Sequence, residues 1–180
     1  FQRVASDRLP LVMQMEADRM ENLRLTEDDV KTERDVILEE RRSRVDNDPG
    51  SILQEQMMAA LYANHPYGIP IIGWEHEIAA LNREDALSYY RRFYAPNNAV
   101  LVIAGDVEPE EVRKLADETY GKLAPNGALN GRHRPQEPTH FAPVKVTLED
   151  PRAGRTTVQR FYLAPSYASA KPGEAEALDL

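Results

Sequence analysis

The spacing of apolar residues changes once along the chain, near residue 96. Before that point apolar residues recur every three or four positions, which is typical of amphipathic helices. The pattern predicts helices over residues 6–23, 26–47, 51–64, 75–81 and 83–94. Beyond it, residues 99–104 form a continuous apolar run, and residues 144–148 and 156–163 alternate between apolar and polar, so these three segments are predicted strands. A further helix is expected over 109–123, and a turn at 150–154 would join the last two strands as a hairpin.

This order of elements indicates the α+β class, with helices packed on one face of a mixed or antiparallel sheet. We divide the chain into a mainly helical part, residues 1–81, and an α+β part, residues 82–180. The chain begins at Phe1 rather than Met, and residues 173–180 have the composition of a helix that has only begun. We therefore expect an internal piece of a longer protein, with a fold truncated at both ends.

The predicted helix over residues 26–47 carries the most informative pattern. Thr26 is a suitable N-cap, with Asp29 three residues later, and acidic residues fill the first turn, where the helix dipole favours them. At about 100° per residue, one stripe of this helix is expected to face the core. That stripe contains three apolar residues and two acids, Val30, Glu33, Val36, Ile37 and Glu40.

Glu33 and Glu40 are the anomaly, because a buried carboxylate is costly unless a cation, a metal or several hydrogen bonds satisfy it. One interpretation is ordinary ion pairing, since Arg44 follows Glu40 by four residues. The other is that one or both carboxylates serve a metal or a proton-transfer site. The helical geometry is compatible with both.

Composition narrows the class of protein but not its activity. The chain has 180 residues and a net charge of −8, which argues against non-specific binding to nucleic acid or anionic membranes. It contains no apolar run near 18 residues, so no membrane span is expected. It also contains no cysteine, which excludes disulfides and thiolate metal sites.

The four histidines do not form a helical zinc-binding pair, because no two of them lie four residues apart on a predicted helix. His65 precedes Pro66 in a turn-rich segment and is expected to be a turn residue. His76 is expected on an exposed helix face. His133 and His140 lie in the Pro- and Gly-rich stretch 124–143, the best candidate for a loop or linker.

Several motifs, in order, resemble the pitrilysin, insulinase and mitochondrial processing peptidase family of zinc metallopeptidases. The octet ERDVILEE at 33–40 looks like the helix that carries the third zinc ligand in that family. The matching segments before and after it are LVMQMEADRMENL at 11–23, HPYG at 65–68, YYRRFYAPNN at 89–98 and the apolar run 99–106.

The resemblance implies that Glu40 is a zinc ligand and that Glu33 is a catalytic-site carboxylate supporting it. In the family a His-x-x-Glu-His motif supplies two histidine ligands and the general base. No such motif occurs in these 180 residues. The resemblance therefore implies a parent zinc metalloendopeptidase whose Zn²⁺ is absent or weakly held by this piece, which is expected to be inactive alone.

Two other functions stay open at this point. The chain could be a non-catalytic scaffold or partner subunit of the same fold, or an unrelated α+β binding domain whose acids are merely ion-paired. The expected partners are a peptide or unfolded protein substrate and either a second copy or a related subunit. Exposed strand edges favour self-association by strand pairing, and the composition suits a bacterial periplasmic or cytoplasmic protein.

Overall fold

The computed structural model describes residues 1–129, 131 and 135–179 and divides the chain into two compact units. The first comprises Phe1–Val36 and the described residues from His76 up to 131. The second comprises Ile37–Glu75 and the described residues from 135 onward.

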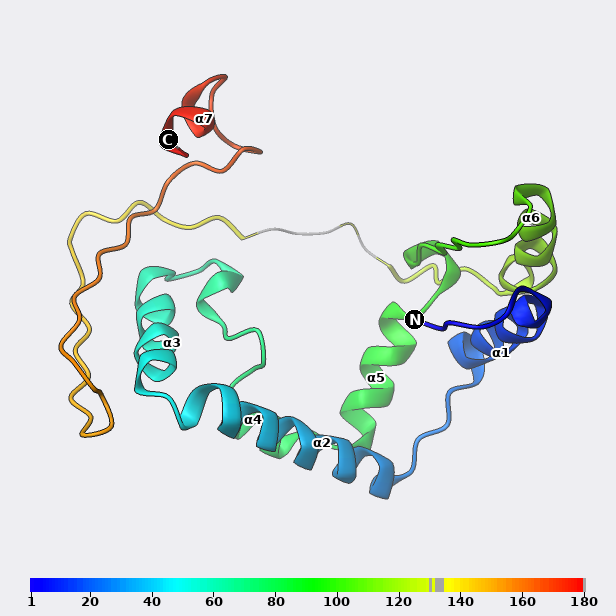
Figure 1. Ribbon diagram of the computed structural model, residues 1–180, viewed down its shortest axis with the longest axis horizontal. Coiled ribbons are helices and arrows are strands. Elements are labelled where there is room, and N and C mark those ends of the chain that lie inside the picture. The colour runs from blue at the N-terminus through cyan, green and yellow to red at the C-terminus, as the bar shows by residue number, and fades with distance from the viewer. Residues whose placement is uncertain (130, 132–134, 180) are drawn as a thin grey trace. The chain divides into compact units, whose positions relative to one another are not determined.

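The first unit is built on helices that the apolar periodicity predicted. It contains η1 (Ser6–Arg8), α1 (Leu9–Asn22), the first part of α2 (Glu27–Arg41), α4 (Glu75–Ala80) from its second residue, α5 (Arg83–Phe93), η4 (Pro96–Asn98), α6 (Pro109–Glu118) and η5 (Tyr120–Lys122) (Figure 1). Its core is small. The buried apolar residues are Met13, Ala17, Ile78, Leu87, Tyr90 and Ala95.

Tyr90 ties α5 to the end of α1 within this unit. Its hydroxyl donates to the backbone carbonyl of Arg19 at 2.9 Å and accepts from the N–H of Leu23 at 3.3 Å. Asn82 caps α5 by accepting from the N–H of Asp85, whose carboxylate in turn accepts from the Asn82 N–H. This reciprocal pair is the capping box that fixes where the helix starts.

The second unit contains the end of α2, η2 (Arg42–Asp46), α3 (Pro49–Leu61), η3 (Pro66–Gly68) and α7 (Glu174–Leu178). The segment Arg42–Asp46 is a π-helical turn that continues directly from α2. Asp48 caps α3, since its carboxylate accepts from the N–H of Ser51 at 2.7 Å. Pro49 occupies the first helical position, where the absence of an N–H costs nothing.

The predicted sheet is wrong for the part of the chain that the structure describes, where no strand is formed. Segments 99–104, 144–148 and 156–163 are all extended but have no ladder partner, so the α+β class with helices on a mixed or antiparallel sheet is not observed. A strand needs a neighbour to satisfy its backbone groups. The first unit holds only one such segment, so Val100 and Val102, expected to be buried, are 89% and 80% exposed.

The predicted turn at 150–154 does form, with the Ala153 N–H donating to the Asp150 carbonyl at 3.0 Å. The two segments that it joins run along the same groove beside α3 in the second unit. The division into residues 1–81 and 82–180 stays a prediction.

Candidate functional site

Helix α2 begins as its sequence predicts. The Thr26 N–H and hydroxyl both donate to Asp29 Oδ2, at 2.8 and 2.7 Å, and Thr26 Oγ1 accepts from the Asp29 N–H at 3.1 Å. The hydroxyl and backbone hydrogen bonds from Thr26 lower the pKa of Asp29. The cap therefore fixes the register of the helix that carries both candidate carboxylates.

Glu33 is exposed, so the prediction that it faces the core is wrong. Within the described residues its carboxylate makes no hydrogen bond or ion pair. Val36, placed on the same predicted stripe, is 55% exposed. The anomaly that singled out Glu33 on physical grounds is therefore not present in this structure.

The covered face of α2 is rotated from the predicted one because it includes two arginines. The residues on it are spaced by three and four and are Val30, Arg34, Ile37, Leu38 and Arg41. Arg34 Nη1 donates to the Leu81 carbonyl at 2.8 Å. An arginine can take such a position because its stem packs against apolar groups while its guanidinium finds acceptors.

Glu40 is half-buried and ion-paired. Its Oε1 lies 2.8 Å from Nη2 of Arg44, one helical turn later, and its side chain keeps 41% of its exposure. The ion-pairing interpretation is thus confirmed for Glu40. Its carboxylate lies on the border between the covered and exposed faces of α2.

Arg41 is the most constrained side chain near Glu40, and sequence patterning missed it. It is 5% exposed, and its guanidinium donates to both oxygens of Glu55 at 2.8 and 2.9 Å and to the Gly73 carbonyl at 2.9 Å. The side-chain hydrogen bond with Glu55 raises the pKa of Arg41. This fork-to-fork pair joins the end of α2 to α3 and to the loop at Gly73.

The Nε atom of Arg41 is less well satisfied than the two terminal nitrogens of its guanidinium. It lies 3.5 Å from Asp46 Oδ1, and it has no hydrogen-bond partner in the described part of the chain. Asp46 is the last residue of the π-helical turn Arg42–Asp46, so Arg41 contacts the far end of the turn that follows it. Extra-residue turns of this kind are frequent at functional sites.

Glu137 is a second residue that the sequence did not indicate. Its carboxylate accepts from the consecutive N–H groups of Ala63, Asn64 and His65 at 2.7, 3.0 and 2.8 Å. Nε2 of His140 lies 2.6 Å from Oε1 of Glu137. Desolvation acts to raise the pKa of Glu137, but the hydrogen bonds outweigh it and lower that pKa to about 2.

The other histidines behave as turn and surface residues. The Nδ1 of His65 accepts from the Tyr67 N–H at 3.2 Å, and the ring packs against Tyr62 and Tyr67, which confirms the turn. His76 is exposed, as predicted. His133 lies outside the described residues, and the sequence alone had no signal for the contact of His140 with Glu137.

The described residues do not by themselves fit a zinc site. A catalytic zinc takes three protein ligands and keeps a fourth position for water. Within the described ranges no group of three His, Cys, Asp or Glu residues lies close enough to hold a metal. Glu40 supplies one suitable oxygen donor, and that donor is held by Arg44.

Comparison with known proteins gives the identification that this geometry alone does not. Residues 1–75 match the family model described as insulinase, peptidase family M16, and residues 80–174 match the one described as the peptidase M16 inactive domain.

In the described part of the chain, every helix is too short or too polar to span a bilayer.

The matched relatives are longer proteins. An uncharacterized zinc protease of Mycobacterium leprae is 37% identical over 121 residues, covering 67% of this chain and 27% of that protein. A probable mitochondrial-processing peptidase subunit beta of Schizosaccharomyces pombe is 32% identical over 118 residues, covering 66% of this chain and 26% of that protein. The chain thus spans about a quarter of the length of these relatives.

A solved structure agrees with both sequence comparisons. The crystal structure of a protease from Helicobacter pylori superposes with a TM-score of 0.61 at 29% identity, covering 74% of this chain and 32% of that one. The family models together run from the first residue to residue 174. The resemblance of the motifs in the sequence is therefore confirmed, and this chain belongs to the insulinase family of zinc proteases, peptidase family M16.

Proposed function

We propose that this chain is part of a zinc-dependent metalloendopeptidase that hydrolyses peptides or unfolded proteins. The observation that carries the proposal is the family match, which includes the α2 octet 33–40. Glu40 is the proposed zinc ligand, because its carboxylate is accessible at the edge of α2 and its present partner is an exposed arginine. Glu33 is the proposed supporting carboxylate, two helical turns earlier on the same helix.

In this proposal the chain contributes one zinc ligand and the contacts that fix its position. Glu40 offers one carboxylate oxygen, and Arg41 fixes the helix end beside it through Glu55 and the Gly73 carbonyl. The remaining ligands and the base would have to come from outside the described residues. Isolated, the 180-residue chain is therefore expected to bind Zn²⁺ weakly and to hydrolyse no peptide.

The experiment compares Glu40→Gln with Glu39→Gln in the longest protein that the gene encodes. Glu39 is the matched control, since it precedes Glu40 on α2 and also pairs with an arginine, Arg42. We expect Glu40→Gln to lose both zinc, measured by atomic emission, and peptidase activity, while Glu39→Gln keeps both. Full zinc occupancy in Glu40→Gln would refute the assignment.

A second function, a non-catalytic partner subunit of the same fold, is favoured by one observation. Residues 80–174 match a model described as an inactive domain. In that case the Glu40–Arg44 ion pair would be permanent. Absence of zinc from the longest gene product, with Glu40→Gln and Glu39→Gln behaving alike, would select this function.

The proposed partners follow from the exposed segments of the second unit. The M16 relative from Schizosaccharomyces pombe is named as a subunit, which supports assembly with a second copy or a related subunit. Apolar residues of the extended segments 141–148 and 156–163 remain exposed, among them Phe141, Val144, Val158 and Tyr162. We propose that this chain self-associates through such a segment. The proposed compartment is the bacterial periplasm or cytoplasm.

A further inference from the structure

The segment Val144–Glu149 has the alternation of a strand but no backbone partner. Only Val146 is half-buried; Lys145, Thr147 and Glu149 are exposed, and Val144 and Leu148, which share the face of Val146 in an extended segment, are 67% and 38% exposed. None of these six residues makes a backbone–backbone hydrogen bond within the described part of the chain. The segment therefore presents free N–H and C=O groups on both edges, which is the usual template for strand pairing.

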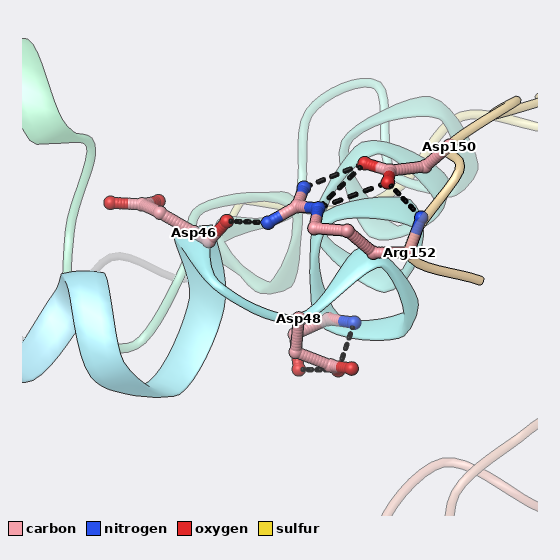
Figure 2. Close-up of polar contacts among 5 residues, drawn as sticks. Asp46, Asp48, Asp150 and Arg152 are labelled. Carbon is pink, nitrogen blue, oxygen red and sulfur yellow. Dashed lines mark hydrogen bonds and ion pairs between the residues drawn. The ribbon is translucent and has the colours of Figure 1, made fainter. Parts of the chain in front are cut away.

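Contacts on either side hold this segment in place. Upstream, Glu137 accepts three N–H groups from the loop that follows α3. Downstream, Arg152 Nη1 donates to the Asp46 carbonyl at 3.0 Å, ahead of α3, and Nη2 lies 2.6 Å from Asp150 Oδ2 (Figure 2). The segment is thus tied near both ends of α3, which lowers the ordering cost of binding a partner.

The charges of this segment favour one antiparallel register with an identical segment. With Thr147 opposite Thr147, Lys145 of each copy faces Glu149 of the other, and Val146 faces Leu148. One face then carries two opposite-charge pairs around a threonine pair, and the other carries two pairs of Val146 with Leu148. A two-fold axis through Thr147 generates both ion pairs at once.

Other registers of the same segment lose this complementarity. A slip by one residue sets charged side chains against apolar ones. Centring the axis on Lys145 or on Glu149 sets like charges directly opposite, which is unfavourable. The other extended segment, 156–163, contains Arg160 but no acid, so it offers no equivalent self-complementary pairing.

We propose that Val144–Glu149 is a dimerisation strand that pairs antiparallel with the same segment of a second copy, in the register centred on Thr147. The inference rests on the self-association proposed above and specifies its surface. One edge of the segment suffices for the dimer, so pairing of the other edge with residues 156–163 of the same chain is compatible with it.

The test is a pair of charge reversals in the longest protein that the gene encodes, read by sedimentation velocity across a concentration series. Lys145→Glu and Glu149→Lys alone each set like charges opposite at both pairs, so each is expected to raise the dimer Kd about tenfold. In a mixed dimer of the two variants, the two acidic positions of one chain face the two basic positions of the other. A 1:1 mixture is therefore expected to recover the wild-type Kd. Lys122→Glu, an exposed charge reversal in the first unit, is the control and should change nothing.

Each outcome decides the proposal. A monomer at every concentration would overturn both self-association and the strand assignment. A dimer that is insensitive to the single reversals, or that the mixture fails to restore, would overturn the register alone. A monomer whose 144–149 amides become protected from exchange only on adding an unfolded protein would assign this edge to substrate instead. The peptidase proposal is unaffected by any of these results, because it is tested through zinc.

Discussion

The buried ion pair between Arg41 and Glu55 provides the sharpest prediction about stability. Both side chains are nearly inaccessible, at 6% and 10% exposure, and the guanidinium also satisfies the Gly73 carbonyl. Arg41→Met leaves a carboxylate and a carbonyl buried without their donor. Breaking one side of such a pair costs about 3–5 kcal/mol, a large part of the stability of an ordinary domain.

The assay is urea unfolding followed by the fluorescence of Trp74, the only tryptophan, which adjoins Gly73 in the second unit. With a urea slope of about 2 kcal/mol per M, the expected loss lowers the midpoint by about 2 M. Arg42→Met is the matched control, because Arg42 is the next residue and its ion pair with Glu39 is 60% and 67% exposed. Such an exposed pair contributes about 0–1 kcal/mol.

A double variant separates the ion pair from simple packing. In Arg41→Met with Glu55→Met no charge remains buried, so its midpoint should lie well above that of Arg41→Met alone. Equal midpoints for Arg41→Met and Arg42→Met would refute the reasoning. So would a double variant whose loss equals the sum of the two single losses.

Three further predictions concern other contacts. The folded-state pKa of Glu137 is lowered from 4.5 to about 2. Its contribution to stability is therefore complete above pH 4.5 and is lost as the pH falls toward 2. A carboxyl ¹³C NMR titration of Glu137 with a midpoint near 4.5 would contradict this. Tyr90→Phe should cost about 1–3 kcal/mol, since the Arg19 carbonyl and Leu23 N–H lose their partner, and a thermal melt unchanged from wild type would exclude the contact. Asn82→Ala should cost about 1 kcal/mol through loss of the α5 cap. Asn22→Ala, whose side-chain amide donates to exposed Asp18, should cost less in the same melt.

Helix positions were predictable from the sequence because their signals are local. The caps at Thr26 and Asn82 and the apolar spacing of Leu87 and Tyr90 all act within a few residues. The spacing also placed Glu40 beside Arg44 one turn later, where the ion pair forms.

The covered face of α2 was not predictable from hydropathy. Arg34 and Arg41 occupy it, and what allows them there is distant in sequence: the Leu81 carbonyl, Glu55 and the Gly73 carbonyl. Hydropathy treats arginine as a solvent-exposed residue, so the predicted buried face of α2 was shifted toward Glu33. The same limit applies to Glu137, whose three N–H donors lie more than 70 residues away.

The sheet was wrong for a related reason. The alternation of apolar and polar residues in 144–148 and 156–163 indicates that each segment is suited to a strand. A strand forms only when a second segment pairs with it, and the local pattern does not identify that segment. The extended, apolar character of these segments was correctly indicated. Their pairing was not, and Val158 and Tyr162 are left 85% and 80% exposed.

The most direct test of the central claim is anomalous X-ray diffraction at the zinc edge from crystals of the longest protein that the gene encodes. The account predicts a zinc peak at about 2.0–2.2 Å from a carboxylate oxygen of Glu40, with the guanidinium of Arg44 displaced from the position it holds in this structure. A Glu40 carboxylate still paired with Arg44, with zinc bound elsewhere or not at all, would contradict it.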